Sequence, residues 1–323
     1  MPNSVEEVRL TANDAIISKM SCVELGYYKD RYIHNFIKRQ AKRTPIINRG
    51  YYSRVAAIEE FVTRFIHHYD CDCQILCLGA GYDTLLFRLH ACDMGLQPKL
   101  FVDLDLEETC ITKATIIRHK SELSEVVYGN TPFDVHDESP SIATDHYILH
   151  PVDLTDIKSM RLFISQFITN KDLPTLILAE CVLIYINPDS VNPTLQYLQS
   201  VFPNSGILVY EQIRPNDPFG SMMVKNLHER GCDLLSIRRY PEREDEKSRY
   251  AGFGYTCTFC EDMNMLYSRL LDPSEIRRVS RIEMFDEYEE WYLIQSHYCI
   301  TIAAQGSFEP WFEEWVKLHS LVS

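Results

Sequence analysis

Strand-length apolar runs alternate with amphipathic helical patterns along most of the chain, and this alternation constrains the fold more than any other feature. The runs cover residues 74–78, 99–104, 147–152, 175–179, 206–211 and 298–303. Between the third and fourth runs, apolar side chains recur at helical spacing through Ile157, Met160, Phe163, Ile164 and Phe167. Repetition of strand followed by helix is typical of a mostly parallel sheet that is covered on both faces. The chain is therefore predicted to have an α/β fold.

Two long stretches depart from this rhythm. Residues 1–53 precede the first core helix, contain several tyrosines, and are predicted to form an N-terminal helical lid. Residues 214–281 combine helical patterns with a charged run and are predicted to be an inserted substrate-binding region above the active edge of the sheet. Residues 131–145 are polar and contain prolines, which predicts a surface loop. With 323 residues and 46% hydrophobic content the chain can bury one large core, so residues 1–323 are predicted to form a single domain. No internal repeat is present.

Charge and cysteine usage restrict the class of protein. Acidic residues outnumber basic ones by 46 to 32, and the formal net charge of −14 repels nucleic acid and anionic membrane surfaces. No window approaches the roughly 20 uncharged apolar residues of a membrane span, and no signal peptide is recognisable at the N-terminus. The 11 cysteines are odd in number, which favours free thiols and a cytoplasmic location. Cys257 and Cys260 have no second Cys-x-x-Cys pair, so no metal site is expected.

A glycine-rich turn after the first strand indicates a nucleotide site. Gly79 and Gly81 would allow a tight turn and close approach of a ligand, and Asp103 and Asp105 follow Gly79 by 24 and 26 residues, where a carboxylate can bind both ribose hydroxyls. A dinucleotide would require a third glycine, where this chain has Thr84, and the preceding Asp83 would repel a pyrophosphate. The pattern therefore favours S-adenosylmethionine, whose ammonium and sulfonium groups are cationic. A tight turn in another α/β protein remains the alternative.

Two more carboxylates stand at strand ends, where this fold exposes ligand contacts. Asp153 is predicted to meet an adenine amino group while Leu154 packs on the ring, and it is also a candidate N-cap for a helix starting at Thr155. Glu180 follows an apolar run that would bury it. A buried carboxylate needs a partner, and a ligand cation or ammonium would supply one.

Four separated motifs carry a family resemblance: LGAGYDT from residue 78, INRGYYSR from residue 47, LILAECVLIY from residue 176 and SHYC from residue 296. In their order along the chain, with INRGYYSR first, these motifs resemble the leucine carboxyl methyltransferase family over about residues 19–305. The resemblance implies a Rossmann-like, seven-stranded, mostly parallel sheet of the S-adenosylmethionine-dependent methyltransferase type. It also implies methylation of the α-carboxylate of the C-terminal leucine on the catalytic subunit of protein phosphatase 2A. A longer relative that acts in wybutosine synthesis carries an added repeat domain and matches less well.

The resemblance further implies the residues of the site. The implied cofactor contacts are Lys19, Arg54, Gly79, Asp105, Asp153, Leu154 and Glu180. Asp103 and Asp105 compete for the ribose, and Asp105 is preferred on its spacing to Lys113.

The ionisation state of the acceptor decides whether the protein must supply a general base. A peptide α-carboxyl, with a pKa of about 3.3–3.7, is ionised at neutral pH and needs no general base. Arg54 is then expected to capture and orient a carboxylate, and Tyr185 to orient Glu180, which makes these two the candidate catalytic residues. His297 is expected to be a packed or hydrogen-bonded core histidine.

Three alternatives remain open at this point. The same fold would serve an S-adenosylmethionine-dependent O-methyltransferase that acts on a small carboxylate or hydroxylated metabolite. A catalytically silent module that binds the phosphatase would not need to retain the glycines and strand-end acids. An NAD-dependent oxidoreductase is disfavoured by the missing third glycine. The sequence leaves the oligomeric state undetermined.

Overall fold

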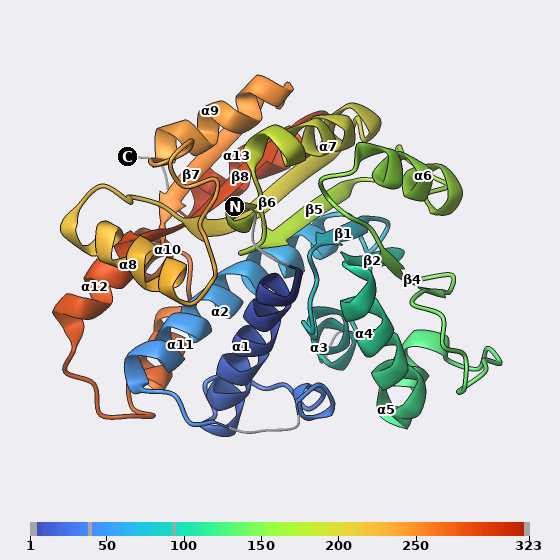
Figure 1. Cartoon of the computed structure of the whole chain (residues 1–323), viewed down its shortest axis with the longest axis horizontal. Helices are drawn as coiled ribbons and strands as arrows, with labels where there is room; N and C mark the ends of the chain where they lie inside the picture. Colours follow the sequence, from blue (N-terminus) through green and yellow to red (C-terminus); the bar gives the residue numbers. More distant parts are fainter. Residues whose placement is uncertain (1–4, 38–40, 93–94, 320–323) are drawn as a thin grey trace.

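A single twisted sheet runs through the computed structural model, which describes residues 5–37, 41–92 and 95–319 (Figure 1). Within these residues the strand order is β3-β4-β2-β1-β5-β6-β8-β7. The strands are β1 (Gln74–Leu78), β2 (Leu100–Asp105), β3 (Ile142–Ala143), β4 (Tyr147–Pro151), β5 (Thr175–Glu180), β6 (Ser205–Gln212), β7 (Cys257–Asp262) and β8 (Tyr298–Ala304). The neighbours of β1 are all parallel, and β8 runs antiparallel between β6 and β7. The predicted Rossmann-like α/β fold is confirmed.

The described sheet has eight strands, and the predicted number of seven was wrong. The additional strand is β3, a two-residue edge that pairs antiparallel with β4 inside the segment predicted to be entirely loop. The apolar runs also failed to reveal β7, which lies within residues 214–281. Only the two central residues of β7, Phe259 and Cys260, are buried, so its sequence lacks a continuous apolar run.

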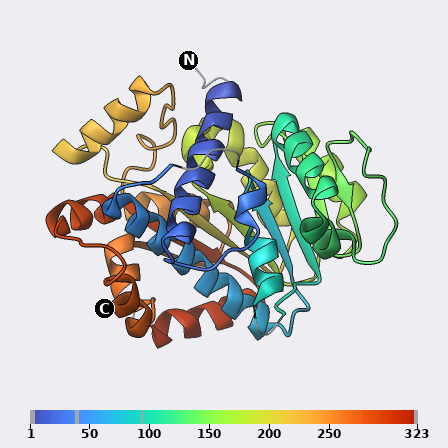
Figure 2. The ribbon, with the colours of Figure 1, turned by 90° about the horizontal axis from the view of Figure 1, so that it is seen from below.

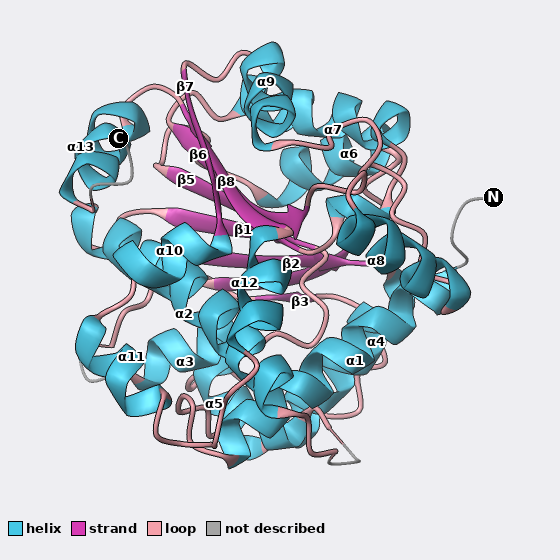
Figure 3. Ribbon diagram, turned by 90° about the vertical axis from the view of Figure 1, so that its left-hand side faces the viewer, coloured by secondary structure: helices cyan, strands magenta, loops and turns pink. Residues whose placement is uncertain are grey.

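Helices cover both faces of the sheet (Figure 3). Side chains of β1 explain the two layers, because Ile75 and Cys77 belong to one hydrophobic cluster and the alternating Leu76 and Leu78 to the other. The first cluster includes residues of α2 (Pro45–His68), α3 (Leu85–Ala91), α4 (Glu107–His119), α5 (Ser121–Tyr128), α10 (Met263–Arg269) and α13 (Phe308–Leu318). The second includes residues of α6 (Ile157–Phe167), α7 (Pro188–Val201) and α9 (Arg243–Phe253).

The N-terminal stretch and the segment after β6 contribute the remaining α-helices. The N-terminal stretch contains α1 (Val5–Glu24) and the short helix η1 (Ile33–Asn35), and α1 lies beside α2, both in blue in Figures 1 and 2. The later stretch holds α8 (Pro218–Glu229) and α11 (Pro273–Val279), followed by α12 (Tyr288–Ser296) before β8. A single turn, η2 (Leu183–Tyr185), joins β5 to α7. The boundaries of the lid and of the inserted region remain predictions.

No helix in the described part of the chain is long and apolar enough to cross a membrane.

Candidate active site

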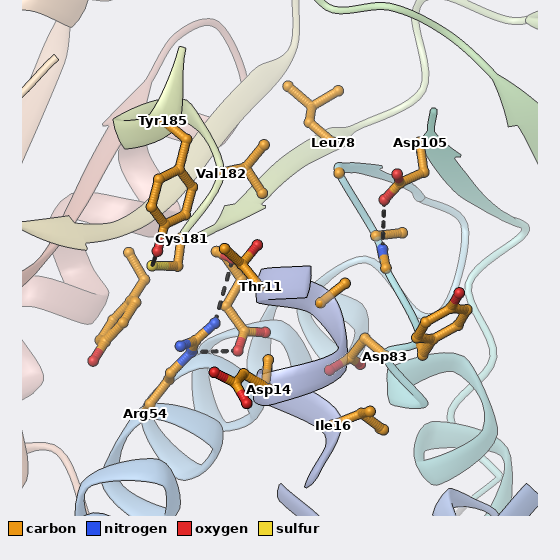
Figure 4. Close-up of a pocket in the computed structure, with 18 of the residues that line it drawn as sticks. Thr11, Asp14, Ile16, Arg54, Leu78, Asp83, Asp105, Cys181, Val182 and Tyr185 are labelled. Atoms are coloured by element: carbon orange, nitrogen blue, oxygen red, sulfur yellow. Dashed lines mark hydrogen bonds and ion pairs between the residues drawn. The ribbon is translucent and has the colours of Figure 1, made fainter. Parts of the chain in front are cut away.

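A cavity of about 1240 Å³ opens beside the carboxyl ends of the parallel strands (Figure 4). Turns after several strands and the first helix α1 contribute to its wall. All of the residues predicted for the site line this one cavity, namely Lys19, Arg54, Gly79, Asp105, Asp153, Leu154, Glu180 and Tyr185. The structure therefore brings the predicted residues together in one cavity, and their assignment as a site and the role of each residue remain predictions.

The turn after β1 takes a conformation that favours glycine. Gly79 and Gly81 have φ angles of +64° and +51°. A Cβ atom at Gly79 would lie 2.6 Å from a methyl carbon of Val182, so this backbone is in direct contact with the segment after β5. At Gly81 the nearest atom is the Cβ of Ala12, at 3.5 Å. The turn thus brings the strand end, the β5 segment and α1 to one point.

The next residues of the turn form hydrogen bonds within the protein. Asp83 pairs with Lys19 and accepts a hydrogen bond from the backbone N–H of Leu85 at 2.6 Å. Burial raises the pKa of Asp83, but Lys19 and Arg88 outweigh burial and hold this pKa far below its usual range. Thr84, at the third-glycine position, is buried and accepts a hydrogen bond from Arg88 at 2.8 Å. Because Lys19 and Arg88 compensate the charge of Asp83, the case against a dinucleotide now rests more on Thr84 than on Asp83.

The two acids of β2 have different surroundings. Asp105 accepts hydrogen bonds from the backbone N–H groups of Gly81 and Leu106, both at 2.7 Å, and burial raises its pKa. Asp103 is 4% exposed, forms an ion pair with Lys113 at 2.8 Å and accepts a hydrogen bond from the Tyr147 hydroxyl at 2.8 Å. Lys113, whose spacing had favoured Asp105, thus pairs with Asp103 instead. Asp103 is buried and paired with a protein ammonium, whereas Asp105 is only partly buried and accepts hydrogen bonds from backbone amides, so Asp105 remains the better candidate for the ribose.

Two cations of the protein hold Glu180 at the end of β5. The Nζ atom of Lys19 lies 2.8 Å from its Oε1 atom, and the Nε atom of Arg54 donates to the same oxygen. Burial raises the pKa of Glu180, but Arg54 and Lys19 outweigh it and keep this pKa below its usual value. Lys19 is only 4% exposed, so its ammonium is not a solvated surface charge. With Asp83 these groups form a neutral cradle of two cations and two carboxylates.

Aromatic side chains surround the Arg54 end of the cradle. The Arg54 guanidinium carbon lies 4.8 Å from the ring centroid of Tyr210 and 5.4 Å from that of Tyr51. Tyr298 stacks on Tyr210 at a centroid distance of 5.5 Å. These tyrosines also line the cavity. Neither Tyr210 nor Tyr298 was predicted as a site residue, although Tyr298 lies within the SHYC motif. The available signal was that Tyr210 and Gln212 share one face at the end of the fifth apolar run.

Tyr185 stands near Arg54 on the same side of the cavity, opposite Asp105 (Figure 4). Its hydroxyl lies 3.7 Å from the Sγ atom of Cys181, the residue that follows Glu180 with a φ of +59°. The predicted contact between this hydroxyl and the Glu180 carboxylate remains a prediction.

Asp153 and Leu154 follow β4 as predicted, with Asp153 exposed and Leu154 buried. Asp153 accepts hydrogen bonds from the backbone N–H and the hydroxyl of Thr155, at 2.8 and 2.7 Å. The N-cap alternative for Asp153 was wrong, because α6 begins at Ile157 and its N-cap is Asp156.

His297 is buried at the C-terminal end of α12 rather than on β8, and it is not among the described residues that line the cavity. Its Nε2 atom lies 2.9 Å from the carboxylate of Asp217 and its Nδ1 atom 2.8 Å from the backbone oxygen of Leu293. The expectation of a hydrogen-bonded core histidine is confirmed.

Known proteins resemble this chain in sequence and fold. A family model described as leucine carboxyl methyltransferase matches residues 10–199. The leucine carboxyl methyltransferase 1 homolog of Arabidopsis thaliana is 43% identical over 301 residues, which cover 93% of this chain and 90% of that protein. Human tRNA wybutosine-synthesizing protein 4 is 32% identical over 306 residues, 93% of this chain but only 44% of that protein. A crystal structure of a putative methyltransferase from Thermobifida fusca has a TM-score of 0.51 at 11% identity and covers 95% of this chain and 96% of that one, which supports the fold. The family model spans more than half of the chain and the Arabidopsis relative nearly all of it, so the chain belongs to the leucine carboxyl methyltransferase family.

Proposed function

We propose that this methyltransferase transfers a methyl group from S-adenosylmethionine to the α-carboxylate of the C-terminal leucine of the protein phosphatase 2A catalytic subunit, forming a methyl ester. The observation that carries the proposal is the position of Arg54, which belongs to the neutral cradle and also lies against the rings of Tyr51 and Tyr210. The names of the relatives support a leucine carboxyl group as the acceptor, and the phosphatase follows from the sequence resemblance.

The residues of the cavity fit S-adenosylmethionine. The methionine end of this cofactor carries one ammonium and one carboxylate, and the cradle of Lys19, Arg54, Asp83 and Glu180 offers two groups of each sign. Asp105 would hold the ribose hydroxyls. Asp153 and Leu154 would hold the adenine.

The proposed reaction requires no general base from the protein. When bound, the cofactor supplies an electrophilic methyl group on a sulfonium. The acceptor carboxylate is already ionised at neutral pH, with a pKa of about 3.3–3.7, so no residue has to remove a proton. Burial raises the pKa of Tyr185, Tyr210 and Tyr298, so the tyrosines near Arg54 stay neutral and do not act as bases. Their task is to exclude water and to position the acceptor.

Arg54 then acts by orientation. A carboxylate and a sulfonium cancel each other's charge as the bond forms, so a cation cannot bind the transition state more tightly than the ground state. In-line transfer requires the acceptor oxygen to be held roughly 3 Å from the methyl carbon, opposite the sulfur. Arg54 has the rigid geometry that this placement requires.

The test is transfer of labelled methyl groups to purified phosphatase with and without its terminal leucine. We expect label only on the full-length phosphatase, and its release as methanol in mild base, which identifies an ester. Label on the truncated phosphatase, or only on small carboxylates or hydroxylated metabolites in a parallel assay, would contradict the proposal. The latter result would favour the metabolite O-methyltransferase.

The cytoplasmic location remains a prediction. It is supported by the eleven cysteines, which the structure holds as free thiols.

A further inference from the structure

A cluster of buried charges lies behind the cavity wall. It consists of Glu211 on β6 with Glu246 and Arg249 on α9, which are 1%, 1% and 4% exposed. The Nη1 atom of Arg249 lies 3.8 Å from an oxygen of each carboxyl group. Tyr210 and Gln212 line the cavity, so the alternation of side chains along β6 directs Glu211 to the opposite face. None of these three charged groups is part of the site described above.

The cluster contains two carboxyl groups but only one guanidinium. Among the described residues, none forms a hydrogen bond with the four carboxyl oxygens or with Nη1 of Arg249. The Nε and Nη2 atoms of Arg249 donate to the side-chain oxygen of Asn192, at 3.3 and 3.1 Å. Two ionised carboxylates would leave one uncompensated negative charge in the core, which is costly. One proton shared by the two carboxyl groups makes the cluster neutral.

The surroundings favour that proton. Burial and then Glu246 raise the pKa of Glu211 to about 8, against the opposing effect of Arg249. Burial also raises the pKa of Glu246 to about 7. Because the two carboxyl groups interact, the pKa values of about 7 and about 8 describe two successive proton losses of the pair and not of one residue each.

The cluster contacts a turn that forms part of the cavity. The backbone amides of Leu183 and Ile184 in η2 face Glu211 and favour its ionised form, although neither reaches full hydrogen-bond geometry. Ile184 accepts a hydrogen bond from the backbone N–H of Ser236 at 3.1 Å. On either side of these residues, Val182 and Tyr185 line the cavity, and Val182 is the residue in contact with the backbone at Gly79. A displacement of η2 would therefore move Val182 and Tyr185, and with them the wall of the cavity beside the glycine-rich turn where the nucleotide is expected to bind.

We propose that Glu211 is a positioning residue for methyl transfer: together with Glu246 and Arg249 it holds η2 in the binding geometry while the two carboxyl groups retain at least one proton between them. Loss of the last proton leaves a buried negative charge, and the cluster lowers its energy by moving apart or admitting water. Either change shifts the wall of the cavity. This role does not depend on which acceptor is methylated.

Other titratable groups face the cluster from each neighbouring element. They are Tyr240 and Tyr250 against Arg249, Asp245 beside Glu246, Cys181 after β5 and Cys299 on β8. Burial raises the pKa of the Tyr250 hydroxyl and of the Cys181 thiol, so both stay protonated at neutral pH. The cluster's charge change between about pH 7 and 9 therefore comes from Glu211 and Glu246.

The test measures the affinity for S-adenosylhomocysteine by calorimetry between pH 6 and 9, together with the thermal midpoint. We expect the wild-type affinity to change little up to pH 8 and then to fall about fivefold by pH 9, below the limit of about tenfold per pH unit for one proton. Glu211→Gln, a neutral amide of the same shape, should bind within about twofold of wild type at pH 7 and lose this decline. Glu211→Ala removes the support of η2 and should bind about tenfold more weakly at every pH. Glu244→Gln changes an exposed carboxylate of α9 and serves as the matched control, with wild-type behaviour throughout.

The comparison separates positioning from mere stability. Carboxyl groups whose pKa is raised from 4.5 to about 7 and about 8 in the folded state stabilise the fold at low pH. This stability is lost progressively as the pH rises from the ordinary carboxyl pKa to the raised values, so the wild-type thermal midpoint should fall between about pH 6 and 8 and then level off. A purely structural cluster would change the thermal midpoint and leave the affinity of the folded protein constant. The proposal is overturned if Glu211→Gln keeps the wild-type decline in affinity above pH 8, or if a folded Glu211→Ala variant binds with full affinity.

Discussion

Replacement of Arg54 by lysine tests the proposed orienting role of Arg54, because it keeps the positive charge and removes the planar guanidinium group. In the structure the Nε atom of Arg54 donates to the Glu180 carboxylate and its Nη2 atom lies 3.4 Å from the Glu180 backbone oxygen. The guanidinium also lies over the rings of Tyr210 and Tyr51. A lysine ammonium can keep an ion pair with Glu180, but it has neither the planar fork nor the flat face of a guanidinium.

The expected loss follows from these contacts. One hydrogen bond to a charged group contributes about 1.5–3 kcal/mol, and a cation over an aromatic ring about 0.5–2 kcal/mol. Misplacement of reacting atoms by about 1 Å can cost roughly 10²-fold in rate. Since a factor of 10² corresponds to about 2.7 kcal/mol, the contact energies and the geometric argument agree. Arg54→Lys should therefore reduce the methyl-transfer rate about 10²-fold while the fold survives.

The assay is the single-turnover methyl-transfer rate, recorded with the thermal midpoint. Arg64→Lys is the matched control, because Arg64 lies on the same helix α2 and pairs with Glu60 at the surface. The control should keep the wild-type rate. A near-normal rate for Arg54→Lys would refute the reasoning and leave Arg54 as a charge without a positioning role.

Three further outcomes are expected. Asp105→Ala should weaken S-adenosylmethionine binding in calorimetry by about 1.5–3 kcal/mol. Asp103→Ala should remove the ion-pair partner of the buried Lys113 and lower the free energy of unfolding by about 3–5 kcal/mol; a larger loss of affinity in the Asp103 variant would contradict the assignment. Gly79→Ala adds a Cβ atom 2.6 Å from Val182 in a backbone with positive φ, so it should abolish cofactor binding or lower the thermal midpoint, and a variant with wild-type binding and stability would show that the turn can relax. The single-turnover rate should be nearly constant between about pH 6 and 8, and a tenfold rise per pH unit would reveal a required general base.

Much of the fold and the location of the site were predictable because both depend on local patterns. The six apolar runs correspond to six strands, and the rule that ligands bind at the carboxyl ends of parallel strands brought Gly79, Asp105 and Glu180 into one cavity. The strand β7 was missed because only its central residues are buried. The strand β3 was missed because two residues are too few to show an alternation of apolar and polar side chains.

Side-chain partners were harder to predict than positions. The spacing along the chain suggested that Lys113 belongs with Asp105, yet its ammonium reaches Asp103 on the adjacent strand. The choice depends on the direction of each side chain in the folded sheet. Spacing alone does not determine that direction. The same limit explains why Lys19, far from Glu180 in sequence, was not recognised as its partner.

The acidity of the chain is compatible with an anionic acceptor because the local and the global charges act at different ranges. A net charge of −14 acts mainly through exposed groups, and salt screens these beyond about 8 Å at physiological ionic strength. Within the cavity, Asp83 and Glu180 are each paired with protein cations, so they offer little net repulsion to a carboxylate that arrives beside Arg54. Repulsion of an anionic acceptor by the net charge is therefore expected to be weak at physiological ionic strength, and the local pairing of Asp83 and Glu180 matters more than the charge of the whole chain.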